Sequence, residues 1–181
     1  DAFGNRSAII EDGVRTEFLV DPFGYGNVVA EYAADGTKIA AYTHGLGLAS
    51  REGAGGSLSF YETDGTGNVT ALTDGTGAIA NTYVYTPFGD ELLETETILN
   101  SFEFNGAIGI MEDTDNLLYM RARTYDVEQG RFLSEDPLFI SGDPNNLYRF
   151  GYNDPVQYVD PSGEIPVPLA VYYAMQAVAA V

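Results

Sequence analysis

Hydrophobic and polar residues alternate over short runs that glycine-rich turns separate. Residues 28–32 (Val-Val-Ala-Glu-Tyr) and 39–42 (Ile-Ala-Ala-Tyr) have the pattern of two strands, and Asp35-Gly36 between them is a hairpin signal that predicts a type I′ turn. Residues 69–72 and 80–85 repeat this arrangement around a turn at residues 74–77. The pattern predicts a chain built from antiparallel β-hairpins.

The hairpins recur with a degenerate period of about 20–22 residues. Gly-Asn pairs stand at 4–5, 26–27 and 67–68, and Phe-Gly pairs at 3–4, 23–24 and 88–89. After Asn27 and Asn68 alike, a glycine follows at the ninth residue and a tyrosine at the fifteenth. One hairpin is marginally stable at best, so we expect these units to join edge to edge into one sheet. The first residues have the pattern of the middle of a repeat, and we expect further repeats upstream.

Residues 117–126 have the pattern of one more strand, with arginines among tyrosines. In a single extended strand, residues 118, 120, 122 and 124 would form an apolar face. The opposite face would carry Tyr119, Arg121, Arg123 and Tyr125. Residues 90–115 hold eight acidic residues and no Lys or Arg. We therefore expect these arginines to pair with acids such as those of 90–115, chiefly as a structural ion-pair ladder.

Two groups of motifs carry a resemblance to a known family. The Gly-Asn, Gly and Tyr positions, with the Phe-Gly turn, are similar to the YD repeat of RHS proteins, toxin-complex C subunits and teneurins. Residues 117–164 resemble the RHS repeat-associated core domain more specifically. They contain Tyr-Met-Arg-Ala-Arg-Thr-Tyr-Asp at 119–126, Gly-Arg-Phe at 130–132, Asn-Leu-Tyr-Arg-Phe-Gly-Tyr at 146–152 and Asp-Pro-Ser-Gly at 160–163.

The resemblance implies an all-β fold, in which antiparallel β-hairpin repeats form part of a curved RHS/YD shell. We expect YD-repeat hairpins at residues 1–100, a shell plug at 101–164 and the start of a variable region at 165–181. The implied function is to enclose a toxin-like polypeptide encoded downstream, in a secreted, exported or cell-surface protein. Its expected partners are that payload, the upstream repeats and a delivery machinery. The alternative is a structural or cell-surface interaction protein that keeps such a shell without cutting itself.

The family's paired Asp-Pro-x-Gly motifs resemble an aspartic protease that acts on its own chain. Carried over, they give Asp136 and Asp160 as catalytic carboxylates and the Glu164–Ile165 bond as the cleavage site. Two close carboxylates share a proton, so one can activate water while the other protonates the amide. Arg131, in the Gly-Arg-Phe corner, is our third candidate catalytic residue.

Two departures from the family pattern bear on this hypothesis. Asp136-Pro-Leu-Phe139 lacks the glycine of the first motif, and Glu164 stands where the family usually has leucine. Asp-Pro is also a common turn former in its own right. It occurs at five positions, namely 21, 136, 143, 154 and 160. For any one pair, the turn is the simpler interpretation.

Composition excludes several other kinds of chemistry. With 27 acidic and 8 basic residues, a net charge of −19 argues against nucleic-acid binding. The excess acid forms a solubilising surface or attracts a basic cargo. There is no cysteine, and His44 is the only histidine, so thiol or Ser-His-Asp catalysis is not expected. Residues 64–68 (Asp-Gly-Thr-Gly-Asn) lack the ligand pattern of an EF-hand and predict a turn. We therefore expect no metal and no cofactor.

The last 17 residues, 165–181, differ in composition from the rest. From Leu169 they are alanine-rich and compatible with a helix, and Pro166 and Pro168 mark its start. The segment is shorter than the roughly 20 residues needed to cross a bilayer.

Overall fold

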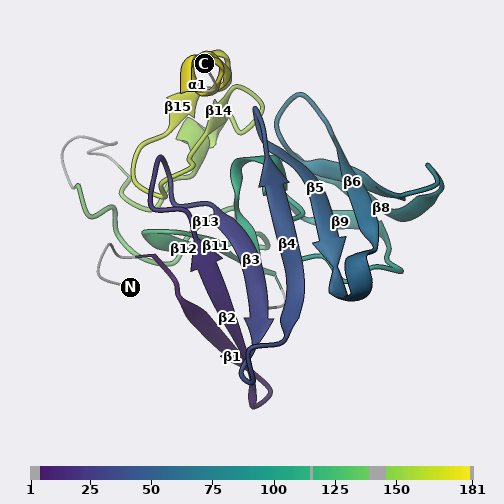
Figure 1. The fold of residues 1–181 in the computed structure, drawn as a ribbon. Helices are drawn as coiled ribbons and strands as arrows, with labels where there is room; N and C mark the ends of the chain where they lie inside the picture. The colour runs from purple at the N-terminus through teal and green to yellow at the C-terminus, as the bar shows by residue number, and fades with distance from the viewer. Residues whose placement is uncertain (1–4, 115, 139–145, 180–181) are drawn as a thin grey trace.

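A nine-stranded antiparallel sheet makes up the first half of the chain in the computed structural model (Figure 1). The structure describes residues 5–114, 116–138 and 146–179, so Phe3-Gly4, Phe139 and the Asp143-Pro144 pair lie outside it. Neighbours in the sequence are neighbours in the sheet. The strands are β1 (Ala8–Glu11), β2 (Val14–Val20), β3 (Val28–Ala33), β4 (Lys38–His44), β5 (Leu48–Gly53), β6 (Leu58–Thr63), β7 (Val69–Asp74), β8 (Ile79–Tyr85) and β9 (Glu91–Thr95).

The two hairpins that the sequence predicts are β3–β4 and β7–β8, and their strands agree with the prediction. The type I′ turn is wrong, because that turn needs positive φ at both central residues and only Gly36 has it. Instead, the Gly36 amide closes a turn onto the Ala33 carbonyl, and the register then shifts by a bulge. Asp35 Oδ1 accepts the Thr37 amide at 2.9 Å, which explains the aspartate at this position.

The second half of the chain forms smaller elements. A four-stranded antiparallel sheet contains β10 (Met111–Thr114), β11 (Leu117–Met120), β12 (Arg123–Asp126) and β13 (Arg131–Phe132). A two-stranded sheet, β14 (Tyr158–Val159) and β15 (Val167–Pro168), leads into the helix α1 (Leu169–Ala179). The 3₁₀ turns η2 (Gly106–Ile108) and η3 (Gly151–Asn153) belong to this half, and η1 (Ala54–Gly56) connects β5 and β6 of the large sheet.

Residues 117–126 form a hairpin, which corrects the expectation of a single strand. Arg121 has a φ of 55°, and the chain reverses over Arg121 and Ala122 so that Met120 pairs with Arg123. After the reversal, odd-numbered residues take the face that even-numbered residues occupy before it. Leu118, Met120, Arg123 and Tyr125 are all buried and share the inner face. The arginine and tyrosine of β12 therefore face the core.

Two apolar clusters fill the interior, and Tyr85 packs against both. The inner face of the large sheet, with Val69, Leu72 and Tyr83, packs on Phe102 from the segment after β9. The second cluster centres on the rings of Tyr125, Phe132 and Phe150. The outer face of the large sheet is exposed, as at Val84 and Leu93. The segment after β9 thus covers one face of the sheet before the chain enters the second sheet.

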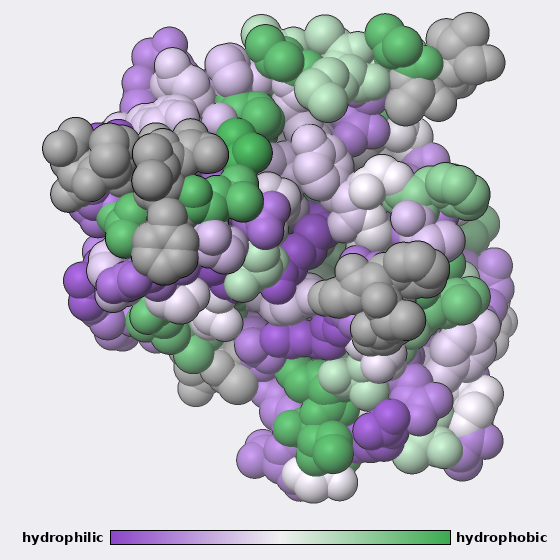
Figure 2. Space-filling model, turned by 90° about the vertical axis from the view of Figure 1, so that its left-hand side faces the viewer, coloured by the Kyte–Doolittle hydropathy of each residue, from purple (hydrophilic) through white to green (hydrophobic). Residues whose placement is uncertain are grey.

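The C-terminal segment is helical from Leu169, as predicted. Tyr172 is buried against Tyr25, with 6.1 Å between ring centroids. Another side of α1 exposes Val171, Met175 and Val178. Figure 2 shows hydrophobic residues along the upper rim of the molecule, on the side where α1 lies in Figure 1. Within the described residues, no helix combines the length and the hydropathy of a membrane span.

Replacing Phe102 tests whether the segment after β9 belongs to the same cooperative unit as the large sheet. Phe102 is fully buried, so Phe102→Ala should lower the free energy of unfolding by about 3–5 kcal/mol. Phe23→Ala is the matched control, since Phe23 is 81% exposed, and it should change stability by less than about 0.5 kcal/mol. Urea unfolding followed by circular dichroism measures both. Equal midpoints for the two variants would contradict this packing.

Candidate functional site around Asp136 and Asp160

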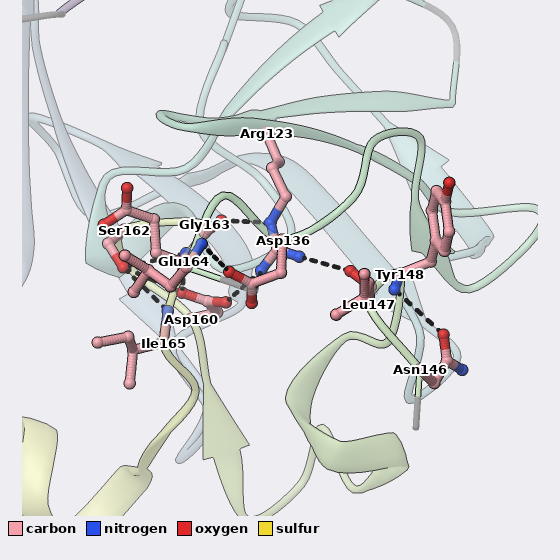
Figure 3. Close-up of polar contacts among 11 residues, drawn as sticks. Arg123, Asp136, Asn146, Leu147, Tyr148, Asp160, Ser162, Gly163, Glu164 and Ile165 are labelled. Atoms are coloured by element: carbon pink, nitrogen blue, oxygen red, sulfur yellow. Dashed lines mark hydrogen bonds and ion pairs between the residues drawn. The ribbon is translucent and has the colours of Figure 1, made fainter. Parts of the chain in front are cut away.

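Three separate segments bring Arg123, Asp136 and Asp160 together. Arg123 opens β12, Asp136 lies in the corner after β13, and Asp160 follows β14. Arg123 Nη2 lies 3.3 Å from Asp160 Oδ2 and 3.5 Å from Asp136 Oδ2. Figure 3 shows the guanidinium pointing toward both carboxylates. The three residues are 3%, 5% and 1% exposed, so water is almost excluded from the group.

The Arg123 side chain is fixed on every side. Its Nε donates a hydrogen bond to the Gly163 carbonyl, and Nη1 donates to the Leu147 carbonyl at 3.1 Å. Its Cζ stands 3.6 Å from the centroid of the Phe132 ring. Planar donors on fixed acceptors leave the guanidinium one orientation. Arg123 therefore positions the carboxylates as well as neutralising charge.

The two aspartates also serve as turn formers. Asp136 Oδ1 accepts the Leu138 amide at 2.8 Å, and Asp160 Oδ1 accepts the Glu164 amide at 3.0 Å. The turn interpretation of Asp-Pro is thus confirmed at both positions. In each aspartate, the second oxygen faces Arg123. One carboxylate oxygen shapes the backbone, and the other belongs to the buried charged group.

Burial is the main electrostatic influence on this group. It raises the pKa of the Asp160 carboxyl above its usual value, and the nearby Arg123 charge opposes the shift. Burial also lowers the pKa of the Arg123 guanidinium. With both carboxylates ionised, the three groups carry a net charge of −1 in a nearly dry site. One bound proton makes the group neutral, which is the state that a low-dielectric site favours.

The backbone of residues 163–165 runs directly beside this group. The Ile165 amide donates to Ser162 Oγ at 3.3 Å, and the Ser162 hydroxyl donates to Asp160 Oδ1 at 3.2 Å. Gly163 has a φ of 70°, and a Cβ there would overlap the Met120 carbonyl oxygen. Glycine is required at 163 because the chain approaches the β11–β12 turn so closely.

The structure places Arg131 apart from this group. It is exposed, and its Nε donates to Gln129 Oε1 at 3.1 Å. Sequence reasoning missed Arg123 as the guanidinium between the aspartates, because it treated residues 117–126 as one strand with outward-facing arginines. A turn at Arg121-Ala122 would have placed Arg123 on the inner face, but no local feature of the sequence marks that turn.

In the hydrogen bonds and ion pairs of the described residues, Arg121, in the turn after β11, and Arg123 of β12 bind groups other than the acids of residues 90–114, which corrects that expectation. Arg121 donates to the Pro161 and Ile108 carbonyls and to Asn27, and Arg123 pairs with Asp136 and Asp160. The turn at residues 64–68 is confirmed, since Asp64 Oδ1 accepts the Thr66 and Asn68 amides. His44 Nε2 lies 2.9 Å from the Val28 carbonyl.

Comparison with known proteins gives consistent matches. The teneurin YD-shell model matches residues 52–156. The tRNA nuclease WapA of Bacillus subtilis is 31% identical over 168 residues, which are 90% of this chain and 7% of WapA. The toxin protein Tse5 of Pseudomonas aeruginosa is 32% identical over 124 residues, covering 68% of this chain and 9% of Tse5.

Solved structures agree on the fold. A Tc holotoxin pore structure from Photorhabdus luminescens superposes with a TM-score of 0.72 at 21% identity, over 92% of this chain and 9% of that one. The chain thus spans less than a tenth of the length of each of these relatives. The teneurin YD-shell family model matches more than half of the residues, and the hairpin repeats and core-domain motifs agree with it. The chain therefore belongs to the RHS/YD-shell family.

Proposed function

We propose that this segment closes an RHS-type shell around a C-terminal toxin-like polypeptide, and that the chain cuts itself between Glu164 and Ile165. The observation that carries the proposal is the buried group of Asp136, Asp160 and Arg123. Arg123 donates a hydrogen bond to the Gly163 carbonyl, and Asp160 accepts one from the Glu164 amide, directly beside the bond to be cut.

Two relatives support the toxin context. One is named a tRNA nuclease and another a toxin protein, and this chain matches only 7–9% of their lengths. Their named activities extend over much longer chains, so a shell segment of this kind accompanies other polypeptide in those proteins. For this chain we infer the same arrangement, with the payload after residue 181 and further repeats before residue 1. We place the whole protein outside the cell that makes it.

The proposed reaction is hydrolysis of one amide bond. Asp136 accepts a proton from a water molecule, whose oxygen bonds to the Glu164 carbonyl carbon. The nitrogen of Ile165 then gains a lone pair and takes a proton, and the carbon–nitrogen bond breaks. That proton comes from Asp160 through the Ser162 hydroxyl. In the resting chain this hydroxyl accepts from the Ile165 amide and donates to Asp160, and both hydrogen bonds reverse as the proton passes. Because the substrate is part of the same chain, its effective concentration is high.

Glu164 modifies this scheme without adding a catalytic group. Its negative charge lies near the buried group and acts on Arg123. This charge raises the pKa of the Arg123 guanidinium and so favours the charged form that pairs with both aspartates.

Asparagine substitutions test the cleavage directly. In a longer natural version of the chain that extends past residue 181, the wild type should yield a fragment ending at Glu164. Asp136→Asn and Asp160→Asn should each slow cleavage by about 100-fold or more, because an amide transfers no proton. Asp21→Asn is the matched control: Asp21 is an exposed Asp-Pro residue that also accepts a backbone amide, and this variant should cut normally. Intact-mass spectrometry over time measures all four. An uncut wild type would favour the non-cleaving shell protein.

Removal of the guanidinium should destabilise the fold more than any loss of an exposed arginine. Arg123→Gln leaves two buried carboxylates without their cation, and we expect a loss of about 3–5 kcal/mol in the free energy of unfolding. Arg131→Gln, at an exposed position, should change stability by less than about 0.5 kcal/mol and leave cleavage unchanged. Urea titrations of both variants give the comparison. Slow cleavage in a stable Arg131→Gln protein would restore the catalytic role first assigned to Arg131.

The raised pKa of Asp160 fixes the direction of the pH dependence. In the folded chain Asp160 keeps its proton above the usual carboxyl pKa of about 4. Its contribution to stability is present below that value and is lost as pH rises through the raised folded pKa. Cleavage, which needs this proton, should slow over the same range. The difference in urea midpoint between wild type and Asp160→Asn, measured from pH 4 upward, isolates this group. The wild type should lose stability relative to Asp160→Asn as the pH rises, and a wild type that gains stability relative to this variant would contradict the assignment.

A further inference from the structure

The residues just after the proposed cut form a strand with residues that precede it. β15 pairs antiparallel with β14, and Val167 lies opposite Val159. The Leu169 amide extends this pairing, because it donates to the Gln157 carbonyl at 2.9 Å. The bond to be cut lies in the loop between these two strands. Hydrolysis would therefore open the loop and leave the strand pairing in place.

The segment after the cut also contributes side chains to the core. Tyr172 of α1 is only 3% exposed and belongs to the second apolar cluster. Val167 and Leu169 pack against the same cluster from partly buried positions, and Pro166 is buried. The downstream side of the cut is thus packed into the core of the upstream side.

The surface that receives α1 includes two turns of the large sheet. In the turn between β2 and β3, the Tyr25 ring centroid lies 6.1 Å from that of Tyr172. In the turn between β6 and β7, a Cβ on Gly67 would stand 3.3 Å from the Tyr173 hydroxyl oxygen. Figure 1 shows α1 at one end of the molecule, together with β14 and β15. The helix therefore contacts two hairpin turns that belong to the upstream side of the cut.

Cleavage would remove a covalent link without removing these contacts. Hydrolysis leaves an ammonium on Ile165 and a carboxylate on Glu164, two opposite charges that start next to each other. Ile165 is 45% exposed, so its new charge meets water and carries little desolvation cost. The Ile165 nitrogen donates to Ser162 Oγ before the cut and keeps hydrogens to donate after it.

We propose that residues 166–173 are an anchor that keeps the downstream fragment bound to the shell segment after the chain has cut itself. This inference rests on the proposed cleavage. The partner of the receiving surface is the new N-terminal end of that fragment, an extended Pro-Val-Pro stretch followed by a helix with adjacent tyrosines. Cleavage and release are then separate steps. Release requires β15 to leave β14 and Tyr172 to leave the core.

The buried tyrosine is the main contact of this anchor. Strand addition supplies main-chain hydrogen bonds, but a pairing of two residues is weak alone. A buried aromatic side chain in a well-packed pocket carries much more of the binding energy. Tyr172 is in that position, whereas Val171 beside it is 47% exposed. The two residues therefore give a test variant and its control on one helix.

Size-exclusion chromatography of the self-cleaved 181-residue chain tests the anchor. Its downstream fragment is a peptide of 17 residues, 165–181, which can leave an open sheet unless contacts hold it. Denaturing mass spectrometry should show two fragments, and the native column should give one peak that contains both. Native mass spectrometry should give the mass of the intact chain plus one water. Fragments that elute separately would overturn the proposal.

Three variants show which contacts hold the fragment. Tyr172→Ala should raise its dissociation constant by about 100-fold or more, since a buried ring is lost. Leu169→Pro fits the first position of a helix but lacks the amide that binds Gln157, and it should weaken binding by about 10-fold. Val171→Ala should change binding by less than about 3-fold. Native mass spectrometry over a dilution series measures the constants, and circular dichroism before cleavage reports folding. An equal loss in Val171→Ala and Tyr172→Ala would contradict this assignment.

Hydrogen exchange in the uncut Asp136→Asn chain separates the anchor from the cleavage. The Leu169 amide should exchange as slowly as the amides of β7, which open only with the whole fold. Tyr172→Ala in this background should speed exchange at Leu169 by about 100-fold and leave β7 protected. A Leu169 amide that exchanges as fast as the exposed end of α1 would overturn the anchor. A wild type that stays uncut would overturn the proposed cleavage alone, and exchange would then decide whether residues 166–173 are held.

Discussion

The ion pairs of Arg123 with Asp136 and Asp160 join the C-terminal half of this chain. They connect β12, the corner after β13 and the loop after β14, three segments with few residues of regular secondary structure between them. A hydrophobic core alone would leave the order of these short segments poorly determined, because apolar contacts are not directional. A planar guanidinium on fixed acceptors is directional, and one misplaced segment would leave a buried charge without its partner. The geometry of the proposed cleavage site and the closure of the small sheets therefore depend on the same contacts.

The large sheet could be predicted from sequence because its signals are local. Aspartate and glycine at fixed offsets form the turns of the two predicted hairpins, and Asp35 and Asp74 both accept backbone amides there. The turn at Arg121-Ala122 carried no such signal, since a positive φ is rare for arginine. Only the contacts that Arg121 makes with the Pro161 and Ile108 carbonyls account for it, and these lie far away in the sequence. One unrecognised turn was enough to assign every following side chain to the wrong face.

The two aspartates of the candidate site were predicted, but from family resemblance and not from local sequence signals. Asp136 and Asp160 came from family resemblance, because 24 residues of separation say nothing about proximity. The structure places both next to Arg123, and the sequence could not choose between Arg123 and Arg131 because that choice depends on the hairpin at 121–122. Ser162 went unnoticed, although its position two residues after Asp160 lets its hydroxyl reach that carboxylate. Long-range pairings of this kind require the fold itself.

The two buried acidic groups differ in how their negative charge is balanced. At Asp136 and Asp160, one arginine from another strand serves two carboxylates, and one further proton would make the group neutral. At the end of the large sheet, Glu103 is buried against Glu91, and burial followed by this contact raises the pKa of the Glu103 carboxyl. A proton between the two carboxyls is the balance that such a contact favours, since two close carboxylates cannot both be ionised in a dry site. The aspartates therefore depend on a residue from elsewhere in the fold, whereas the glutamates depend on each other.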